Sequence, residues 1–593
     1  MTTRPTRLRE WIAVLAAGAF VSLLYVDKPF HIDDVLYLRV VDQILRTPLD
    51  PYQGIVLWDA KDGQPASLFL TNHNPPLSQY IQAAALYAFV PPERRGESEY
   101  LLHWLQSAAV VVAGLGVFQL ARRLCPYPLW ATLFVLSAPF FLPGQNIMLE
   151  APALAFAAWG VEFYWRARLG ISPLQWASLS GVLIAAAILT KYSAGVLLPI
   201  LGWDALRRRE FRSLALMIAP IAALAAWAVW TSSTHGRPHL GAHGVAFEIA
   251  RWHFKALTAV REIGAVQTVG GALVLAAMFQ AGRMRQWTWL VGLACAAAGL
   301  SVIDIVQARR NAALENADVT PLQQAQFALF TAHGFLSIAV AALATRLSST
   351  NSGDDRFLWW WIAGVFLFNV CCTPFAAVRH LLLLFVPFVF LSGRILERLG
   401  AGGFRWGALL ASVILGTGLA SADYQFAESA AETARKDVRG LVVDRAANSR
   451  TVWFSGNWGF VYYAQRAGAF PWVKNPETYG MPSIQPGDYV VQPKIMSWVG
   501  LDRALPRGMK LERFQHWQPM ARVEGTPASI LGQLLRTIAP GVNYYAVKAD
   551  ALPWEVLVLP VDPQERQTGA TFAIPTMGDY IVYRVTRIGP AGD

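Results

Sequence analysis

Residues 101–123 have the sequence LLHWLQSAAVVVAGLGVFQLARR, in which an uncharged, largely apolar run ends at the pair Arg122 and Arg123. A helix needs about 20 predominantly apolar residues to cross the hydrocarbon core of a bilayer. Arginines directly after such a run are typical of the cytoplasmic end of a membrane-spanning helix. This stretch therefore predicts a helix that crosses a membrane and ends in the cytoplasm.

The same pattern recurs along the chain and predicts about thirteen membrane-spanning helices. We place them at 10–26, 101–121, 127–142, 150–166, 173–190, 192–206, 213–232, 264–281, 287–305, 323–345, 357–376, 380–396 and 404–421. With the amino terminus in the cytoplasm, the arginines of the short loops gather on the cytoplasmic side. The alternation places three polar regions, 27–100, 233–263 and 422–593, on the opposite face.

The composition supports a membrane protein. Of the 593 residues, 54% are hydrophobic and only 15% are charged, whereas soluble domains average about 25% charged residues. The net charge of +11 is explained by the cytoplasmic loops, so the lipid bilayer is an expected partner and nucleic acid is not. The four cysteines lie in or beside apolar runs, which indicates neither a disulfide framework nor a cysteine-rich metal site.

The sequence divides into two parts. Residues 1–421 form the predicted transmembrane domain, including the first outer loop, 27–100. Residues 422–593 form a predicted soluble tail with a helix at 423–446 and strand-like runs at 451–454, 489–491, 554–561 and 580–585. The fold class expected is thus a polytopic α-helical membrane protein with a C-terminal soluble mixed α/β domain.

Two adjacent carboxylates, Asp33 and Asp34, follow the first span and begin a predicted helix that includes Tyr37. Neighbouring residues of a helix lie about 100° apart, so one acid can face a cleft while the other caps the helix. The alternative is that both acids only cap and solvate the helix.

Further polar residues lie at other outer turns. His73 and Asn74 precede Pro75 and Pro76 at the start of a predicted helix, and Glu150 begins a span. A helix start favours an anion, so His73 and Asn74 have a binding role, or they are exposed polar residues of an ordinary proline-initiated loop. Glu150 is either a helix-start charge or a site residue.

Cations lie at two more outer turns. Lys191 stands between two spans, and Arg379 precedes His380 in a stretch without acidic neighbours. A guanidinium matches the geometry of a phosphate, so Arg379 fits a lipid phosphate better than a protein carboxylate. Lys191 is expected to pair with an anionic ligand or with one of the carboxylates. The alternative for both cations is anchoring at the lipid headgroups.

Three histidines of the second outer region, 233–263, are spaced four residues apart: His235, His239 and His243. This spacing aligns metal ligands on a helix, but Gly236, Pro238 and two further glycines interrupt the run. The sequence therefore argues against a zinc site there.

The order of these elements resembles the GT-C membrane glycosyltransferases, specifically the family 39 group of protein O-mannosyltransferases and lipid A aminoarabinose transferases. The resemblance rests on Asp33-Asp34, on the element 73–77 (HNPPL), on 149–152 (LEAP), on 189–192 (LTKY) and on Arg379-His380. Three positions differ from the family: Asp34 replaces glutamate, Asn74 stands where histidine is common, and Glu150 stands where aspartate is usual.

The resemblance implies a membrane glycosyltransferase that moves a sugar from a polyprenyl-phosphate donor to an acceptor at the extracytoplasmic face, with inversion. Asp33 is then expected to be the general base, with Asp34 as a second catalytic acid. The donor phosphate is expected to be bound by Lys191, Arg379, His380 and His73, supported by Asn74, Glu150 and Tyr37. The acceptor and any divalent metal stay unknown.

The expected location is a bacterial-type inner membrane, with a cytoplasmic amino terminus and an extracytoplasmic C-terminal domain. The main alternative function is a multi-span transporter or flippase. Transporters place ionisable groups near the membrane midplane, whereas here most lie at span ends. His333 and Glu162 are the exceptions to this placement.

Overall fold

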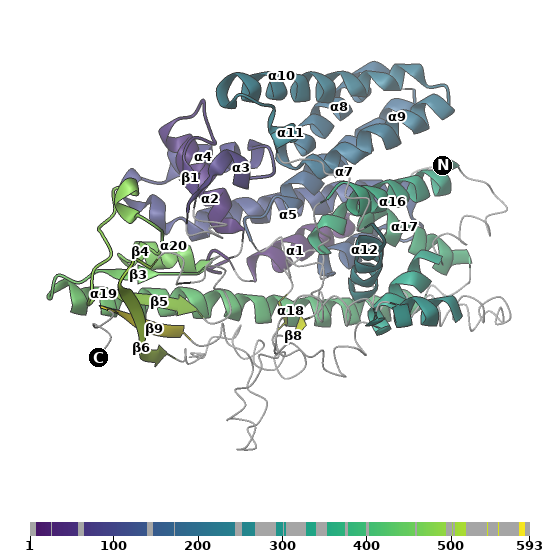
Figure 1. The fold of residues 1–593 in the computed structure, drawn as a ribbon. Helices are drawn as coiled ribbons and strands as arrows, with labels where there is room; N and C mark the ends of the chain where they lie inside the picture. The colour runs from purple at the N-terminus through teal and green to yellow at the C-terminus, as the bar shows by residue number, and fades with distance from the viewer. Residues whose placement is uncertain are drawn as a thin grey trace.

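The computed structural model describes residues 8–24, 26–31, 33–56, 64–138, 146–170, 172–242, 252–266, 292–300, 302–303, 328–339, 353–373, 378–398, 403–456, 459–493, 501, 505–517, 542–543, 555–556 and 580–587. Within these residues the chain is mainly helical, with a mixed sheet near the carboxyl terminus (Figure 1).

Long helices form the body of the molecule. They are α1 (Leu8–Leu23), α5 (Glu99–Leu124), α6 (Pro128–Ser137), α7 (Glu150–Arg168), α8 (Pro173–Thr190), α9 (Leu197–Arg207), α10 (Ile218–His235), α12 (Trp252–Val266), α16 (Gly353–Cys371), α17 (Leu382–Arg398) and α18 (Phe404–Thr433). The predicted spans before 233 and after 353 coincide with helices of this set. Spans 264–281, 287–305 and 323–345 lie largely outside the described residues.

Four helical segments of the described chain are long and apolar enough to cross a membrane: Glu99–Leu124, Pro173–Thr190, Phe211–His235 and Arg379–Arg398. Shorter apolar helices occur at Pro128–Ser137, Ala328–Ala339 and Phe404–Ile414. The helical architecture agrees with the predicted fold class, and the number of spans stays a prediction.

Small residues allow the helices to approach closely. A Cβ atom at Gly181 of α8 would lie 2.5 Å from the backbone oxygen of Leu216. The hydroxyl of Ser180 donates a 2.7 Å hydrogen bond to the backbone oxygen of Gly160 in α7. Close backbone contact and interhelical hydrogen bonds of this kind stabilise helix pairs in a membrane.

A layer of ion pairs joins one end of these helices. Its carboxylates bind arginines that the sequence places in the cytoplasm: Glu162 with Arg123 and Arg166, Asp204 with Arg208, and Asp355 with Arg394 and Arg398. We call this set the arginine layer. Glu150, at the start of α7, is about 18 Å along the helix from Glu162. The two ends of α7 are thus polar, with an apolar length between them.

The first outer loop consists of short elements. They are α2 (Asp34–Arg46), the hairpin strands β1 (Ile55–Val56) and β2 (Ala66–Ser67), α3 (Leu68–Thr71) and α4 (Leu77–Phe89). Figure 1 shows α2, α3 and α4 at the same end of the molecule as the C-terminal sheet.

Helix α18 connects the body to the C-terminal part. It continues without a break through the predicted boundary at 421/422, then through a π-helical turn, Ala434–Val438, into α19 (Arg439–Ala446). The apolar run ends near residue 421, which explains the predicted boundary, but the helix itself does not end there.

The C-terminal sheet has the strand order β4-β3-β5-β9-β6. Its strands are β3 (Val452–Phe454), β4 (Phe470–Pro471), β5 (Tyr489–Pro493), β6 (Met509–Trp517) and β9 (Tyr580–Arg587), and α20 (Gly459–Arg466) joins β3 to β4. Strand β3 is parallel to β4 and β5, whereas β9 is antiparallel to β5 and β6.

The predicted strands at 451–454, 489–491 and 580–585 belong to this sheet, and the mixed α/β character is confirmed. Of the predicted strand 554–561, the described part is β8 (Glu555–Val556), which pairs with β7 (Val542–Asn543).

Candidate functional site

Asp33 and Arg379 are bound to each other. Asp33 lies at the N-cap of α2, and Arg379 lies in the 3₁₀ turn Val378–Leu381 that leads into α17. Nη2 of Arg379 donates a 2.8 Å hydrogen bond to Oδ2 of Asp33. The first outer loop and the beginning of a late membrane helix therefore meet at this pair.

Glu150 and Lys191 extend the pair into a cluster. Nζ of Lys191, which follows α8, donates to Oε1 of Glu150 at 2.6 Å. Nε of Arg379 lies 3.5 Å from the same oxygen. We call these four residues, Asp33, Glu150, Lys191 and Arg379, the Asp33 cluster. It unites side chains from four elements that are far apart in the sequence.

The expectation that Arg379 lacks a protein carboxylate is wrong. Its guanidinium contacts two, Asp33 and Glu150. The local sequence could not show these partners, because both come from other elements. A guanidinium has five N–H donors, so these contacts are compatible with binding a phosphate as well.

Burial shifts the proton affinities in this cluster. The pKa of Asp33 is raised by burial, an effect that the charge of Arg379 opposes and the charge of Glu150 reinforces. The pKa of Lys191 is lowered by burial, and the Glu150 carboxylate opposes that change. The Asp33 side chain keeps 16% of its surface exposed, whereas that of Glu150 keeps 3%. Asp33 is thus the carboxylate of this pair that is open to an incoming group.

Asp34 faces a different environment from Asp33. It is fully buried, and its Oδ2 accepts a 2.9 Å hydrogen bond from the backbone N–H of His31. Burial raises its pKa well above the usual value. This hydrogen bond lies within its own turn, whereas Glu150, Lys191 and Arg379 bond to one another and to Asp33. The two acids therefore diverge, as helical neighbours should, with Asp34 on the buried side.

Two more predicted residues lie near the cluster. Tyr37 is buried one helical turn after Asp33, and its pKa is raised well above the usual value, first by burial and then by the charge of Asp33. His73 is exposed, and its charge lowers the pKa of Asp33. The structure thus brings both residues within electrostatic reach of Asp33.

The backbone of the His73 turn is held on both sides. The carbonyl of Asn74 accepts a hydrogen bond from the Tyr52 hydroxyl. The carbonyl of Asn72 accepts one from Nε2 of His239 at 2.9 Å. Asn74 thus contributes to this turn through its backbone. For His380, the described bond is likewise to the backbone, because its carbonyl accepts a hydrogen bond from Asn369 at 3.3 Å.

The bond to Asn72 fixes the proton positions in a short chain. A carbonyl can only accept, so Nε2 of His239 carries a proton, and Nδ1 lies 2.9 Å from the Tyr192 hydroxyl, from which it accepts a hydrogen bond when the ring is neutral. The Tyr192 oxygen in turn accepts a hydrogen bond from Trp227 at 2.9 Å. Because Tyr192 follows Lys191, this chain links the lysine turn to the His73 turn.

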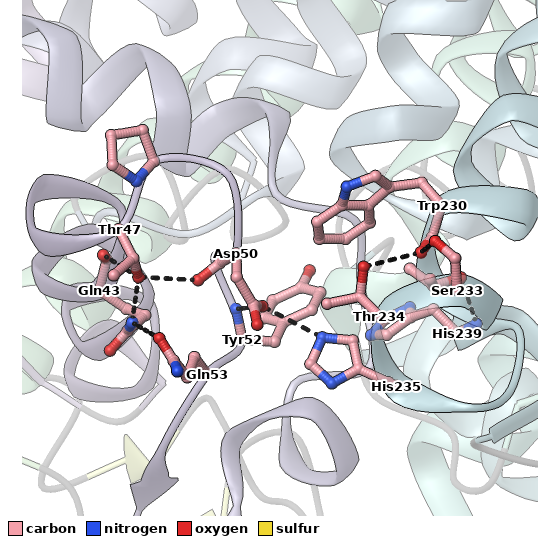
Figure 2. Close-up of polar contacts among 12 residues, drawn as sticks. Gln43, Thr47, Asp50, Tyr52, Gln53, Trp230, Ser233, Thr234, His235 and His239 are labelled. Carbon is pink, nitrogen blue, oxygen red and sulfur yellow. Dashed lines mark hydrogen bonds and ion pairs between the residues drawn. The ribbon is translucent and has the colours of Figure 1, made fainter.

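His235 is used in a similar contact. Figure 2 shows its ring pointing from the end of α10 toward Asp50, and Nε2 lies 3.1 Å from the Asp50 carboxylate. The ring also stacks on Phe69 with centroids 4.2 Å apart. His235 and His239 thus join region 233–263 to region 27–100. His243 lies outside the described residues, within which no group of three metal-ligating side chains is found.

Two buried sets of charged residues were not identified from the sequence: Glu262 and the Lys28–Asp423 pair. Glu262 of α12 is 3% exposed, and burial raises its pKa to about 8, opposed by Arg261 and Arg379. Lys28 forms a buried ion pair with Asp423 of α18. Asp423 lies two residues past the end of the predicted span 404–421, so no charge within an apolar run marked it.

A family model described as dolichyl-phosphate-mannose-protein mannosyltransferase matches residues 100–234, from α5 to the end of α10. This segment contains Glu150 and Lys191, whereas Asp33 and Arg379 lie outside it. None of the curated protein sequences matches the chain at a significant level.

Two solved structures are distantly similar. The oligosaccharyltransferase AglB from Archaeoglobus fulgidus, in complex with an inhibitory peptide and a dolichol-phosphate, aligns at 14% identity over 82% of this chain and 69% of that chain, with a TM-score of 0.45. ArnT from Cupriavidus metallidurans, bound to undecaprenyl phosphate, aligns at 15% identity over 82% of this chain and 93% of that chain, with a TM-score of 0.35. The resemblance to protein O-mannosyltransferases is confirmed for residues 100–234 by the family model.

Proposed function

We propose that this chain is a membrane glycosyltransferase that moves a sugar from a polyprenyl-phosphate donor to an acceptor lipid, glycan or protein at the extracytoplasmic face, with inversion. The observation that carries the proposal is the Asp33 cluster, in which one semi-exposed carboxylate lies beside two buried cations. The match of residues 100–234 to a family of lipid-phosphate-dependent mannosyltransferases supports the same chemistry.

Asp33 is the general base of this proposal. An acceptor hydroxyl attacks the anomeric carbon while the Asp33 carboxylate removes its proton. An unperturbed aspartate has a pKa of about 3.9 and is a weak base. The raised pKa of Asp33, caused first by burial, makes the carboxylate a stronger base. Arg379 holds the carboxylate in place through the 2.8 Å hydrogen bond.

The leaving group is the lipid phosphate, which gains negative charge as the bond to the anomeric carbon breaks. Arg379 and Lys191 supply the compensating positive charge in a site with little water. Glu150 contacts both cations through one oxygen and so sets the distance between them. Asp34, on the buried side of α2, supports the helix start from which Asp33 projects.

The location of the cluster fits a lipid-linked donor. It lies at the start of α7, the end of α8 and the start of the Arg379–Arg398 segment, opposite the arginine layer. With the arginine layer in the cytoplasm of a bacterial-type inner membrane, the cluster and the C-terminal sheet are extracytoplasmic. A polyprenyl phosphate presents its headgroup at this depth.

The described ionisable residues give less support to a transporter. Glu162, one of the two exceptions noted in the sequence, binds Arg123 through two hydrogen bonds of 2.8 and 2.9 Å within the arginine layer. The other, His333, bonds through Nδ1 to the carbonyl of Gly264 at 2.9 Å, where two helices touch. Both side chains thus have partners that join helices.

The test uses the purified full chain in vesicles with a labelled polyprenyl-phosphate sugar and a panel of lipid, glycan and peptide acceptors. We expect transfer by the wild type, loss of transfer in Asp33→Asn, and retention in Asp42→Asn, a matched change on the same helix. Equal transfer by Asp33→Asn and the wild type would show that Asp33 is not the general base. Movement of the donor across the vesicle membrane without transfer would favour the flippase instead.

A further inference from the structure

The segment that leads into Asp33, residues 28–31, is buried against the C-terminal part of the chain. Lys28 is fully buried, forms an ion pair with Asp423 of α18, and donates a 2.5 Å hydrogen bond to Asn146. A buried ion pair gains little net stability, because desolvation of the charges offsets their attraction. The pair therefore contributes mainly by fixing the position of Lys28 against α18.

The same carboxylate reaches the residue two positions before Asp33. Oδ1 of Asp423 lies 3.6 Å from Nε2 of His31. Burial, and then the charge of Lys28, lowers the pKa of His31 well below its usual value, so the ring is neutral. The His31 carbonyl accepts a 3.1 Å hydrogen bond from the N–H of Asp34, which completes a tight turn with Asp33 inside it.

Tyr463 of α20 holds the backbone of this segment from the other side. Its hydroxyl accepts a 2.9 Å hydrogen bond from the N–H of Phe30 and donates a 2.6 Å bond to Glu99. Glu99 also accepts a 2.8 Å hydrogen bond from Arg435, whose guanidinium lies over the Tyr463 ring. The hydroxyl thus connects α20 to both the first outer loop and the start of α5.

Helix α20 approaches the segment as closely as a backbone permits. A Cβ atom at Gly459, its first residue, would lie 2.2 Å from the carbonyl oxygen of Phe30. The Tyr462 ring packs edge-on against the Phe30 ring with centroids 5.3 Å apart. Arg39, further along α2, donates a hydrogen bond to Gln465 of α20. The contact therefore runs from residue 30 into the helix that Asp33 begins.

We propose that α20 and Asp423 form a clamp on residues 28–31 that positions Asp33 against Arg379. In this account Tyr463 and Asp423 are positioning residues, and the C-terminal domain is part of the catalytic apparatus. The inference rests on the proposed function in one respect, because the effect of positioning Asp33 is measured as the rate of sugar transfer. The contacts themselves are independent of the substrate.

The test compares Tyr463→Phe with Tyr479→Phe in the full chain. The first change removes the hydroxyl that bonds Phe30 and Glu99, whereas the second removes the hydroxyl of a tyrosine that is 37% exposed at the end of the 3₁₀ turn Pro476–Tyr479. Hydrogen exchange is measured on the peptide that covers residues 28–37, and transfer is measured as kcat and as KM for the labelled donor.

For Tyr463→Phe we expect faster exchange at 28–37 with unchanged exchange in α7 and α8. We also expect a decrease in kcat of about tenfold with little change in KM, because a small displacement of a catalytic group has large effects on rate. The acidic limb of its kcat profile should move to higher pH, as Asp33 separates from Arg379. Tyr479→Phe should match the wild type.

Unchanged exchange at 28–37 in Tyr463→Phe would overturn the clamp, whatever the activity. Loss of protection throughout the helical body would overturn it as well, because the contact would then be a general structural support. Absence of transfer in every protein, the wild type included, would refute the proposed function, while the exchange result would still decide the clamp. Asp423→Asn should also increase the rate of exchange at 28–37. Asp423→Glu should show slower exchange there than Asp423→Asn.

Discussion

Arg379 donates a 2.8 Å hydrogen bond to the carboxylate of Asp33, although the two residues are 346 positions apart in the chain. Arg379 precedes the helix that begins at Leu382, and Asp33 precedes the helix that begins at Asp34. Two helix starts are thus joined by one ion pair. In the proposed mechanism, this pair couples the general base to the cation that faces the leaving phosphate.

The first prediction concerns pH. Burial raises the pKa of Asp33, and Arg379 opposes this effect. A base must be deprotonated to act, so activity should rise with pH through that raised pKa and be lost below it. In Arg379→Gln the opposing charge is gone, so the acidic limb of the kcat profile should move to still higher pH.

The pH profile of Arg379→Gln is compared with that of Arg237→Gln, a change at an exposed arginine after α10. The control should keep the wild-type profile. An acidic limb that stays in place in Arg379→Gln would mean that Asp33 is not the titrating base.

The second prediction concerns the leaving group. Lys191→Met removes a buried cation that bonds Glu150 at 2.6 Å. Removal of one charge-stabilising donor costs about 10²-fold in kcat in other enzymes, and we expect a similar loss of transfer here. Lys191→Arg should retain more activity, and Lys474→Met, at an exposed position, should retain all of it. Steady-state transfer by Lys191→Met at the wild-type rate would assign Lys191 to headgroup anchoring instead.

The main helices could be predicted from the sequence, because long apolar runs have few alternatives to a membrane helix. The same alternation predicted Glu150 and Lys191 at the same end of their helices, and the structure joins them. The helix predicted at 423–446 is present as the end of α18 and α19, but its continuity with the span predicted at 404–421 was missed, because a helix can outlast its apolar run.

Partners of buried charges could not be predicted. Lys28 and Asp423 are 395 residues apart, and neither stands in a pattern that indicates the other. Arg379 has no acidic neighbour in its local sequence, yet it bonds a carboxylate. Such pairs depend on how the helices pack, which the apolar pattern does not specify.

The third prediction concerns the His73 turn. His239→Phe removes the donor to Asn72 and the acceptor of the Tyr192 hydroxyl. A buried polar group left without a partner costs about 1–3 kcal/mol, so the free energy of unfolding should fall by at least that amount. His235→Phe should cost less, because the ring can still stack on Phe69 and Asp50 is partly exposed. Thermal unfolding in detergent measures the loss of stability in each variant. Equal losses would refute the hydrogen-bond chain from Tyr192 through His239 to Asn72.

The fourth prediction distinguishes the role of the arginine layer from that of the Asp33 cluster. Glu162 is fully buried and binds Arg123 and Arg166, so Glu162→Gln leaves two guanidinium groups without their carboxylate. The removal of one partner from a buried ion pair costs roughly 3–5 kcal/mol. We expect a lower unfolding temperature with unchanged turnover per folded molecule. Reduced turnover at unchanged stability would instead give the arginine layer a role in substrate movement.

The most direct measurement is a double-mutant cycle on the transfer rate with Asp33→Asn, Arg379→Gln and the combined variant. If the two side chains act as one unit, the combined variant should be about as slow as the slower single variant, because each change already disrupts the pair. If the combined loss equals the product of the two single losses, Asp33 and Arg379 act independently, and the account of a joint base and phosphate site is wrong.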